Sequence, residues 1–345
     1  MTIETTGPAL APDPAAAPDP AAAPDPAADP VLPRGRPRAA DGEGAGGWRA
    51  ERRQGHPVLG ALSPSRASDF TTCPLLYRYR TIDRLPEPPS SAMARGTLVH
   101  TVLEDIFDLP PDDRTLATAV EMVAGTWQRI VEEEPELAAV VVQSAAAEDS
   151  SDPEVVARWL QGAEPLLATY FRMEDPRLLN PAHRELHVEI PLPDGPLLRG
   201  YVDRVDIHQQ AGIRIVDYKT GRAPGPRFEQ KAMFQLRFYA LVVWRMTGEL
   251  PALLQLTYLG SGEYLRLVPD PDDLITFEAK VRVLWDSIVA VFDSGEWTPK
   301  PSRLCDWCSF QQLCPAKGGE LLPLPERARP DATGIPRGAE PVNTG

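Results

Sequence analysis

Two short segments in the second half of the chain, each with apolar residues at alternate positions, constrain the fold most. They cover residues 198–208 and 212–219 and are separated by a few polar residues. This pattern predicts two β-strands joined as an antiparallel hairpin. Because successive side chains of a strand point to opposite faces, one face of the second strand carries Ile213, Ile215, Asp217 and Lys219. That face begins apolar and ends in an acid and a lysine, so we expect the last two side chains to lie where the core meets a cleft.

Asp203 in the first strand fits the same picture. It shares a face with three positions that we expect in the core, Tyr201, Val205 and Ile207. Two carboxylates and one lysine would then meet at one end of the hairpin. Phosphodiester hydrolysis needs such a set, because carboxylates bind Mg²⁺, the metal activates water, and a lysine stabilises developing charge. An ordinary hairpin with a surface salt bridge is the alternative interpretation.

A metal shared by the two aspartates would fix the register of the hairpin. Directly opposite residues of an antiparallel pair share a face, and a slip by one residue inverts that relation. If Asp203 faces Asp217, residues 209–211 form a three-residue loop. We therefore predict an odd-length turn with a positive φ at Gly212. The side chains expected on the face away from the metal are Arg204 and Asp206.

Further helices and strands are predicted around this hairpin. Ser63 before Pro64 is a helix-start signal. Apolar residues recur at helical spacing over 94–108, 112–175, 228–247 and 270–293, with a polar interruption at 148–153. Additional strands are expected over 185–192, 252–259 and 264–268. This order predicts an α/β fold with a central mixed sheet and a helical insertion.

The two ends of the chain differ from its middle. The 345 residues include 39 prolines that crowd both ends, and the unit Ala-Pro-Asp-Pro-Ala-Ala repeats between Ala11 and Ala28. Such segments cannot bury enough apolar surface to offset the entropy of ordering. We expect a disordered tail over residues 1–57, a folded domain over 58–320 and a second disordered tail over 321–345.

The four cysteines are arranged as one early residue and three late ones. Cys73 precedes Pro74, and the others follow as Cys305, Cys308 and Cys314. In a cytoplasmic chain such cysteines are more often metal ligands than disulfides, and four thiolates suit zinc or an iron–sulfur cluster. Zinc ribbons usually offer two C-x₂-C pairs, and the single pair here favours iron–sulfur. Joining such distant residues would act as a clasp, because it removes loop-closure entropy from the unfolded chain.

The acid and lysine pattern resembles a known signature. Asp203 followed by Asp217-Tyr218-Lys219 is similar to the D…(D/E)-x-K motif of the PD-(D/E)XK nuclease superfamily, which has a restriction-endonuclease-like core. The fuller sequences, Gly-x-x-Asp-Arg-x-Asp from Gly200 and Asp-Tyr-Lys-Thr-Gly from Asp217, resemble the RecB-type exonuclease family. That family includes AddB-like nucleases and the CRISPR adaptation nuclease. The resemblance spans residues 63–317.

Three further segments match the RecB-type family in the order expected. The stretch Gly96 to His100 resembles its Gly-x-x-x-His helix, and Gln235 to Tyr239 resembles its Gln-x-x-x-Tyr motif. The resemblance implies a metal site made by His100, Asp203, Asp217 and the carbonyl of Tyr218. It implies that Lys219 positions the attacking water and that Gln235 and Tyr239 contact the substrate or the site. It also implies a [4Fe–4S] cluster held by Cys73, Cys305, Cys308 and Cys314.

The sequence therefore indicates a Mg²⁺- or Mn²⁺-dependent DNA exonuclease that acts on a free or single-stranded end, in DNA repair or recombination. The alternative is a partner-dependent or non-catalytic DNA-end-binding module on the same fold, and a more remote one is a zinc-stabilised interaction protein. No Walker A pattern, G-x-x-x-x-G-K-[ST], occurs in the sequence. A helicase or repair partner is therefore expected to supply any motor.

The overall charge limits how the chain can bind DNA. A net charge of −14 excludes a protein that coats nucleic acid by bulk charge, although a locally basic groove remains compatible with DNA binding. Residues 77–80 alternate tyrosine and arginine, which suits either base stacking with phosphate pairing or an ordinary amphipathic surface.

No segment approaches the roughly 18 apolar residues of a membrane span, and no secretory signal begins the chain, so a cytoplasmic location is expected.

Overall fold

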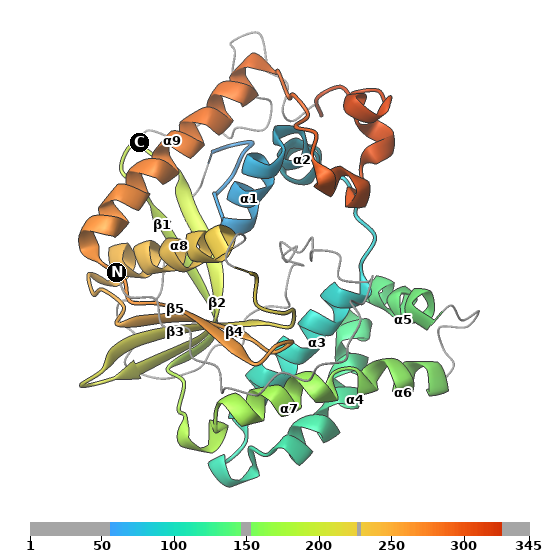
Figure 1. The fold of residues 1–345 in the computed structure, drawn as a ribbon, viewed down its shortest axis with the longest axis vertical. Coiled ribbons are helices and arrows are strands. Elements are labelled where there is room, and N and C mark those ends of the chain that lie inside the picture. The colour runs from blue at the N-terminus through green and yellow to red at the C-terminus, as the bar shows by residue number, and fades with distance from the viewer. Residues whose placement is uncertain (1–55, 146–152, 226–228, 326–345) are drawn as a thin grey trace, which may run out of the picture.

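A five-stranded mixed sheet forms the centre of the computed structural model, which describes residues 56–145, 153–225 and 229–325 (Figure 1). The strands lie in the order β1-β2-β3-β4-β5. The pair β3–β4 is parallel and the other neighbours are antiparallel. The strands are β1 (His183–Pro191), β2 (Leu197–His208), β3 (Gly212–Lys219), β4 (Leu253–Tyr258) and β5 (Glu263–Leu267). The predicted α/β class with a central mixed sheet is confirmed.

Helices cover the two faces of this sheet (Figure 1). One group packs with the strands in a first core: α1 (Pro64–Thr72), α2 (Pro74–Tyr77), α8 (Glu229–Thr247) and α9 (Pro271–Ser294). The other group forms a second core: α3 (Ser91–Asp105), α4 (Leu116–Glu133), α5 (Ala138–Ala145), α6 (Pro153–Gln161) and α7 (Glu164–Met173). The segment predicted as a helical insertion is therefore a separate layer of four helices, α4 to α7, packed on α3.

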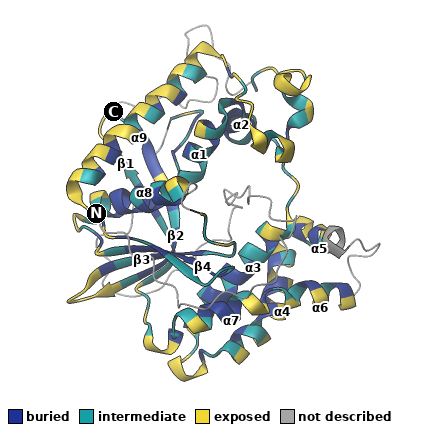
Figure 2. Ribbon diagram, in the orientation of Figure 1, coloured by how far each residue is buried: buried dark blue, intermediate teal, exposed yellow. Residues whose placement is uncertain are grey.

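Strand alternation divides β3 between the two cores. Ile213 and Ile215 pack in the first core, whereas Val216 and Tyr218 pack in the second. Figure 2 shows that α8 and the central strands are largely buried, while the outward side of α9 is exposed. Asp217 lies two residues after Ile215 in the strand, so its side chain points to the same face of the sheet, which α8 covers.

The register predicted for the β2–β3 hairpin is confirmed. Arg204 pairs with Val216, and His208 pairs with Gly212, which leaves residues 209–211 as the three-residue loop. Gly212 has a φ of 77°, a left-handed conformation that costs glycine little. Asp203 and Asp217 are therefore aligned across the hairpin, as a shared metal site requires.

The expected core face of β2 is only partly correct. Val205 is buried, but Tyr201 is half-buried against His187, and Ile207 is 48% exposed. Ile207 lies beyond the start of β1, which pairs with β2 only as far as Val205. Val202 and Val205 are three residues apart, so in a regular strand they would point to opposite faces of the sheet, yet both pack in the first core. The regular alternation of side chains along β2 is therefore interrupted next to Asp203.

Several element boundaries differ slightly from the sequence prediction. Helix α3 begins at Ser91, earlier than predicted, because the Ser90 side chain accepts a hydrogen bond from the Met93 N–H. It ends at Asp105, and Ile106–Asp108 forms a 3₁₀ turn. Ser63 caps α1 as predicted. Most of the predicted N-terminal tail, the polar interruption near 148–152 and residues 326–345 lie outside the described residues.

Among the described residues, every helix is too short or too polar to span a lipid bilayer.

Gly200 in β2 lies under the aromatic ring of Tyr239 from α8. A Cβ at this position would lie 2.6 Å from Tyr239 Cε1. We predict that Gly200→Ala lowers the free energy of unfolding by about 1–3 kcal/mol, because the ring is packed in the core and cannot move freely. Gly125→Ala is the control: it lies within α4 with no atom within 4 Å of its added Cβ, so it should stabilise by about 0.5–1 kcal/mol. Urea denaturation measures both, and equal effects would contradict the close contact.

Candidate active site

Asp203 is flanked by a carboxylate on each neighbouring strand. Arg204 pairs with Val216, and extending this pairing by one residue places Asp217 of β3 opposite Asp203. Glu185 of β1 is opposite it on the other side, between the pairs Arg184–Arg204 and Leu186–Val202. All three acids are at least nine-tenths buried. The central strand thus places one acid between two others at the same level of the sheet.

The Asp203 carboxylate is held by backbone and faces a histidine. Its Oδ2 accepts a hydrogen bond of 2.7 Å from the Tyr218 N–H. The same oxygen lies 3.3 Å from Nδ1 of His100, which helix α3 contributes from the second layer. The site is therefore formed where the sheet and α3 meet.

The Asp217 carboxylate is engaged on both oxygens. Gln235 on α8 donates from Nε2 to Oδ1 at 2.9 Å, and Lys219 Nζ lies 2.7 Å from Oδ2. Burial, opposed by the charge of Lys219 and reinforced by the charge of Asp203, raises the pKa of Asp217 to about 6. A site that holds its acids this close in a dry environment favours a bound cation.

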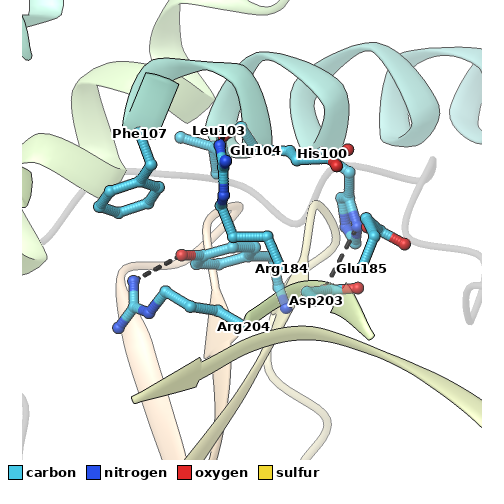
Figure 3. Close-up of a pocket in the computed structure, with 9 residues that line it drawn as sticks. His100, Leu103, Glu104, Phe107, Arg184, Glu185, Asp203 and Arg204 are labelled. Atoms are coloured by element: carbon cyan, nitrogen blue, oxygen red, sulfur yellow. Dashed lines mark hydrogen bonds and ion pairs between the residues drawn. The ribbon is translucent and has the colours of Figure 1, made fainter. Parts of the chain in front are cut away.

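A third ligand residue joins His100 and Asp203. One ligand atom from each of His100, Glu185 and Asp203 lies within 4.8 Å of the others. In Figure 3 these three side chains point toward one another at one end of the pocket beneath α3. No sequence motif marks Glu185, so its place in the site could not be predicted from the sequence. It has a φ of 45° within the strand.

Helix α8 brings the other two predicted residues to the sheet. Gln235 contacts Asp217, as described above, whereas Tyr239 lies over Gly200, three residues before Asp203. Tyr239 is 7% exposed. The structure therefore brings His100, Asp203, Asp217, Lys219 and Gln235 to one place, with Tyr239 beside them.

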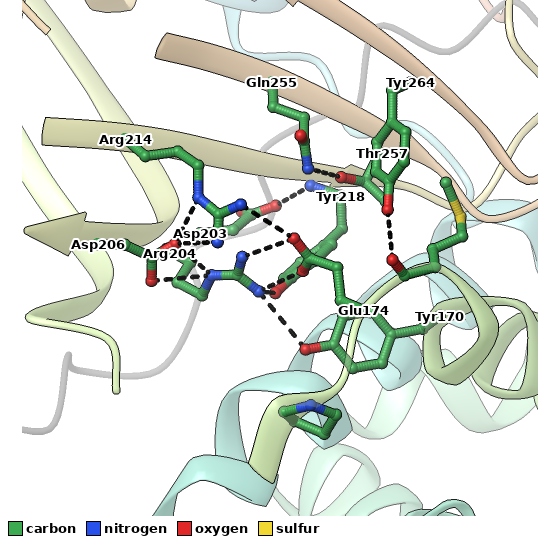
Figure 4. Close-up of polar contacts among 12 residues, drawn as sticks. Tyr170, Glu174, Asp203, Arg204, Asp206, Arg214, Tyr218, Gln255, Thr257 and Tyr264 are labelled. Atoms are coloured by element: carbon green, nitrogen blue, oxygen red, sulfur yellow. Dashed lines mark hydrogen bonds and ion pairs between the residues drawn. The ribbon is translucent and has the colours of Figure 1, made fainter. Parts of the chain in front are cut away.

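A buried polar network supports the Tyr218 side of the site (Figure 4). Arg204, which is 1% exposed, donates to the Tyr218 hydroxyl at 2.6 Å and to Glu174, the residue that directly follows α7, at 2.8 Å. Arg204 also pairs with Asp206, which in turn binds Arg214. As predicted, Arg204 and Asp206 point away from Asp203.

This network is electrostatically balanced in spite of its burial. Burial opposes ionisation of Glu174, but the charge of Arg204 holds the pKa of Glu174 below its usual value. The same acid, together with Tyr218, keeps the pKa of Arg204 well above its usual value against the effect of burial. The network ties α7 to β2 and β3, and so it orients the residue whose N–H binds Asp203.

Residues 77–80 do not form a nucleic-acid surface. Tyr77, Arg78 and Tyr79 are at most 2% exposed, and Arg78 pairs with Asp83 at 3.0 Å. Arg80 is bound by Asp69 and Glu87. The alternation of tyrosine and arginine reflects core packing around a π-helical turn, Arg78–Asp83, rather than stacking on bases.

The early and late cysteines lie in neighbouring segments. The 3₁₀ turns around Cys305, Cys308 and Cys314 lie beside α1 and α2, which Cys73 connects (Figure 1). Burial raises the pKa of the Cys308 thiol, and the charges of the other three cysteines raise it further. Lys300 Nζ donates to the Thr71 carbonyl at 2.8 Å, and the Tyr79 hydroxyl donates to the Leu313 carbonyl at 2.6 Å. These hydrogen bonds hold the segment around Cys73 against the segment that carries the other three cysteines.

Comparison with known proteins agrees with this geometry. Residues 61–315 match the family model of the PD-(D/E)XK nuclease superfamily, and the chain belongs to that superfamily. It is 27% identical over 273 residues to the Gene 69 protein of Mycobacterium phage D29, covering 73% of this chain and 96% of that protein. It is 24% identical over 295 residues to the Gene 69 protein of Mycobacterium phage L5, covering 75% and 97%.

A solved structure is also similar to the chain. The crystal structure of a candidate exonuclease from Eubacterium rectale superposes with a TM-score of 0.48 and 16% sequence identity. The match covers 77% of this chain and 90% of that one.

The pair Glu174–Arg204 provides a test of the supporting network. Glu174→Leu should lower the free energy of unfolding by about 3–5 kcal/mol, because it leaves the buried guanidinium without its main partner. The double variant Glu174→Leu/Arg204→Met should lose clearly less than the sum of the two single variants. Arg177→Ala, which removes the fully exposed pair with Asp175, is the control and should resemble the wild type. Additive losses in denaturant titrations would show that the two side chains act independently.

Proposed function

We propose that the protein is a metal-dependent DNA exonuclease of the RecB type. The observation that carries the proposal is the convergence of His100, Asp203, Asp217 and Lys219 at one buried end of the hairpin. Oxygen ligands with one imidazole suit Mg²⁺ or Mn²⁺. We assign the metal ligands as His100, Asp203, Asp217 and the Tyr218 carbonyl.

The residues around the acids have distinct proposed roles. A bound divalent cation would supply Lewis-acid chemistry, neutralising phosphate charge and making water a better nucleophile. Lys219 would position that water and stabilise the charge that develops on the phosphate. Gln235 would orient Asp217, which it already contacts at 2.9 Å. Tyr239, packed on Gly200, would hold the strand in place and contact the substrate from α8.

The substrate is proposed to be DNA with a free or single-stranded end. Superfamily membership supports a nucleic-acid substrate, and the net charge of −14 confines binding to the neighbourhood of the site. Because the sequence has no Walker A motif, any helicase that presents the end would be a separate protein. Cleavage of end-labelled single- and double-stranded DNA with Mg²⁺ or Mn²⁺ tests the proposal. Binding of DNA ends without any cleavage would favour the non-catalytic module.

We further propose that Cys73, Cys305, Cys308 and Cys314 hold a [4Fe–4S] cluster. The support is that Cys73, far from the other three cysteines in the sequence, connects α1 and α2, which lie beside the turns that carry Cys305, Cys308 and Cys314 (Figure 1). The cluster would clasp the segment of α1 and α2 to the C-terminal turns.

Lys219→Ala should lower kcat by at least about 10²–10³-fold while DNA binding stays within a few-fold of wild type. The lysine acts on charge that appears only in the transition state, so its loss affects kcat more than binding. Lys280→Ala on the exposed side of α9 is the control and should cleave normally. Single-turnover cleavage and filter binding measure the two effects, and near-normal kcat in the first variant would remove Lys219 from the mechanism.

Cys308→Ser should remove the visible absorption of anaerobically purified protein and lower its stability sharply, since cluster binding is coupled to folding. Ser309→Ala next to it is the control and should keep both. Absorption spectra, iron and sulfide content, and thermal unfolding measure the outcome. Zinc in place of iron, or a fully stable colourless variant, would contradict the proposed cluster.

A further inference from the structure

Arg95 of α3 is a half-buried arginine that differs from the buried arginines described above. Its Nε is buried without a hydrogen-bond partner, and within residues 56–145, 153–225 and 229–325 no carboxylate pairs with its guanidinium. Arg78 and Arg204, by contrast, are each held by an acid. Burial lowers the pKa of Arg95, and no acid of the described chain raises it again. The described part of the fold therefore holds a cation without the anion that would stabilise it.

The guanidinium of Arg95 is packed between α3 and α6. Its Cζ lies 5.2 Å from the centroid of the Trp159 ring, and Trp159 Nε1 donates to Ser91 Oγ at 2.9 Å, which fixes the ring. Gly162 lies so close that a Cβ there would be 2.9 Å from Arg95 Cζ. The ring face stabilises the charge only weakly, through a cation–π interaction. Packing thus positions the guanidinium, while the side chain as a whole remains partly exposed.

Arg95 lies close to the acid site but points away from it. It precedes His100 by five residues on α3, which corresponds to about 7.5 Å along the helix axis. His100 turns to the acid site, whereas Arg95 turns to α6. Between them, Gly96 lies against Thr220, which follows the end of β3, because a Cβ at 96 would be 3.6 Å from Thr220 Oγ1. Along a DNA strand whose charges advance about 3.4 Å each in the duplex, the separation corresponds to one or two nucleotides.

We propose that Arg95 binds a backbone phosphate of the DNA strand, next to the phosphodiester that is cleaved. A planar guanidinium matches two phosphate oxygens, and a phosphate supplies the anion that Arg95 lacks in the described fold. Such a contact fixes the position of the strand and does not involve the reacting atoms. The identification of the phosphate as part of DNA rests on the proposed function.

Binding of a fluorescently labelled single-stranded DNA in EDTA tests this assignment independently of cleavage. Arg95→Met keeps a long side chain on Trp159 but removes the charge, so we expect about 10–100-fold weaker binding at low salt. The slope of log K against log salt should become shallower by about 0.7, the contribution of one phosphate contact. Arg158→Met is the matched control, because it removes an exposed arginine next to Trp159, and it should bind within a few-fold of the wild type.

Two further measurements distinguish phosphate binding from a structural role. Because a buried charge without a counter-ion costs stability, Arg95→Met should unfold at or above the wild-type temperature. Gly162→Ala keeps the charge but displaces the guanidinium, so it should fold normally and bind DNA less tightly. Normal DNA binding in Arg95→Met, or a lower unfolding temperature of that variant, would overturn the proposal.

DNA cleavage by the same variants separates this inference from the proposed function. Arg95→Met should raise KM while kcat stays within a few-fold, unlike Lys219→Ala, because a flanking contact acts equally in the ground state and the transition state. Wild-type protein that binds DNA through Arg95 but does not cleave it keeps the phosphate site and rejects the nuclease. Cleavage by the wild type with an unchanged KM in Arg95→Met keeps the nuclease and rejects the phosphate site.

Discussion

The hydrogen bond from the Tyr218 N–H to the Asp203 carboxylate is the contact on which the site depends. It joins the two strands of the hairpin at the point where their paired ladder ends, and it fixes the carboxylate within reach of His100. Charge-assisted hydrogen bonds of this kind are stronger than neutral ones. The acid is thereby held in a buried position before any cation or substrate binds, which is the preorganisation that catalysis needs.

The two layers of helices act on this contact from opposite sides. From the second layer, Glu174 at the C-terminal end of α7 binds Arg204, and Arg204 donates to the Tyr218 hydroxyl. From the first layer, Gln235 of α8 binds Asp217. The helical insertion is therefore part of the frame of the site, since its loss would release Tyr218 and with it the orientation of Asp203.

Much of the site follows from local sequence, because a hairpin couples register, turn length and face. The spacing of Asp203 and Asp217, with a glycine that tolerates positive φ at 212, is enough to predict which side chains meet. Glu185 could not be predicted in this way, because it lies on a third strand, outside the hairpin, and no motif marks it. Residues 77–80 were predicted to lie on the surface because two of the four are arginines. In the fold, buried acids pair with these arginines, so the segment packs in the interior.

The most direct test of the account is the location of metal in a crystal of the protein soaked with Mn²⁺, measured by anomalous scattering. If Asp203 binds the catalytic metal, an anomalous peak lies within bonding distance of an Asp203 carboxylate oxygen, with His100 among the neighbouring ligands. Mn²⁺ bound only elsewhere, for example at the Glu174 and Asp206 carboxylates, with none at Asp203, would contradict the assignment of this hairpin as the catalytic centre.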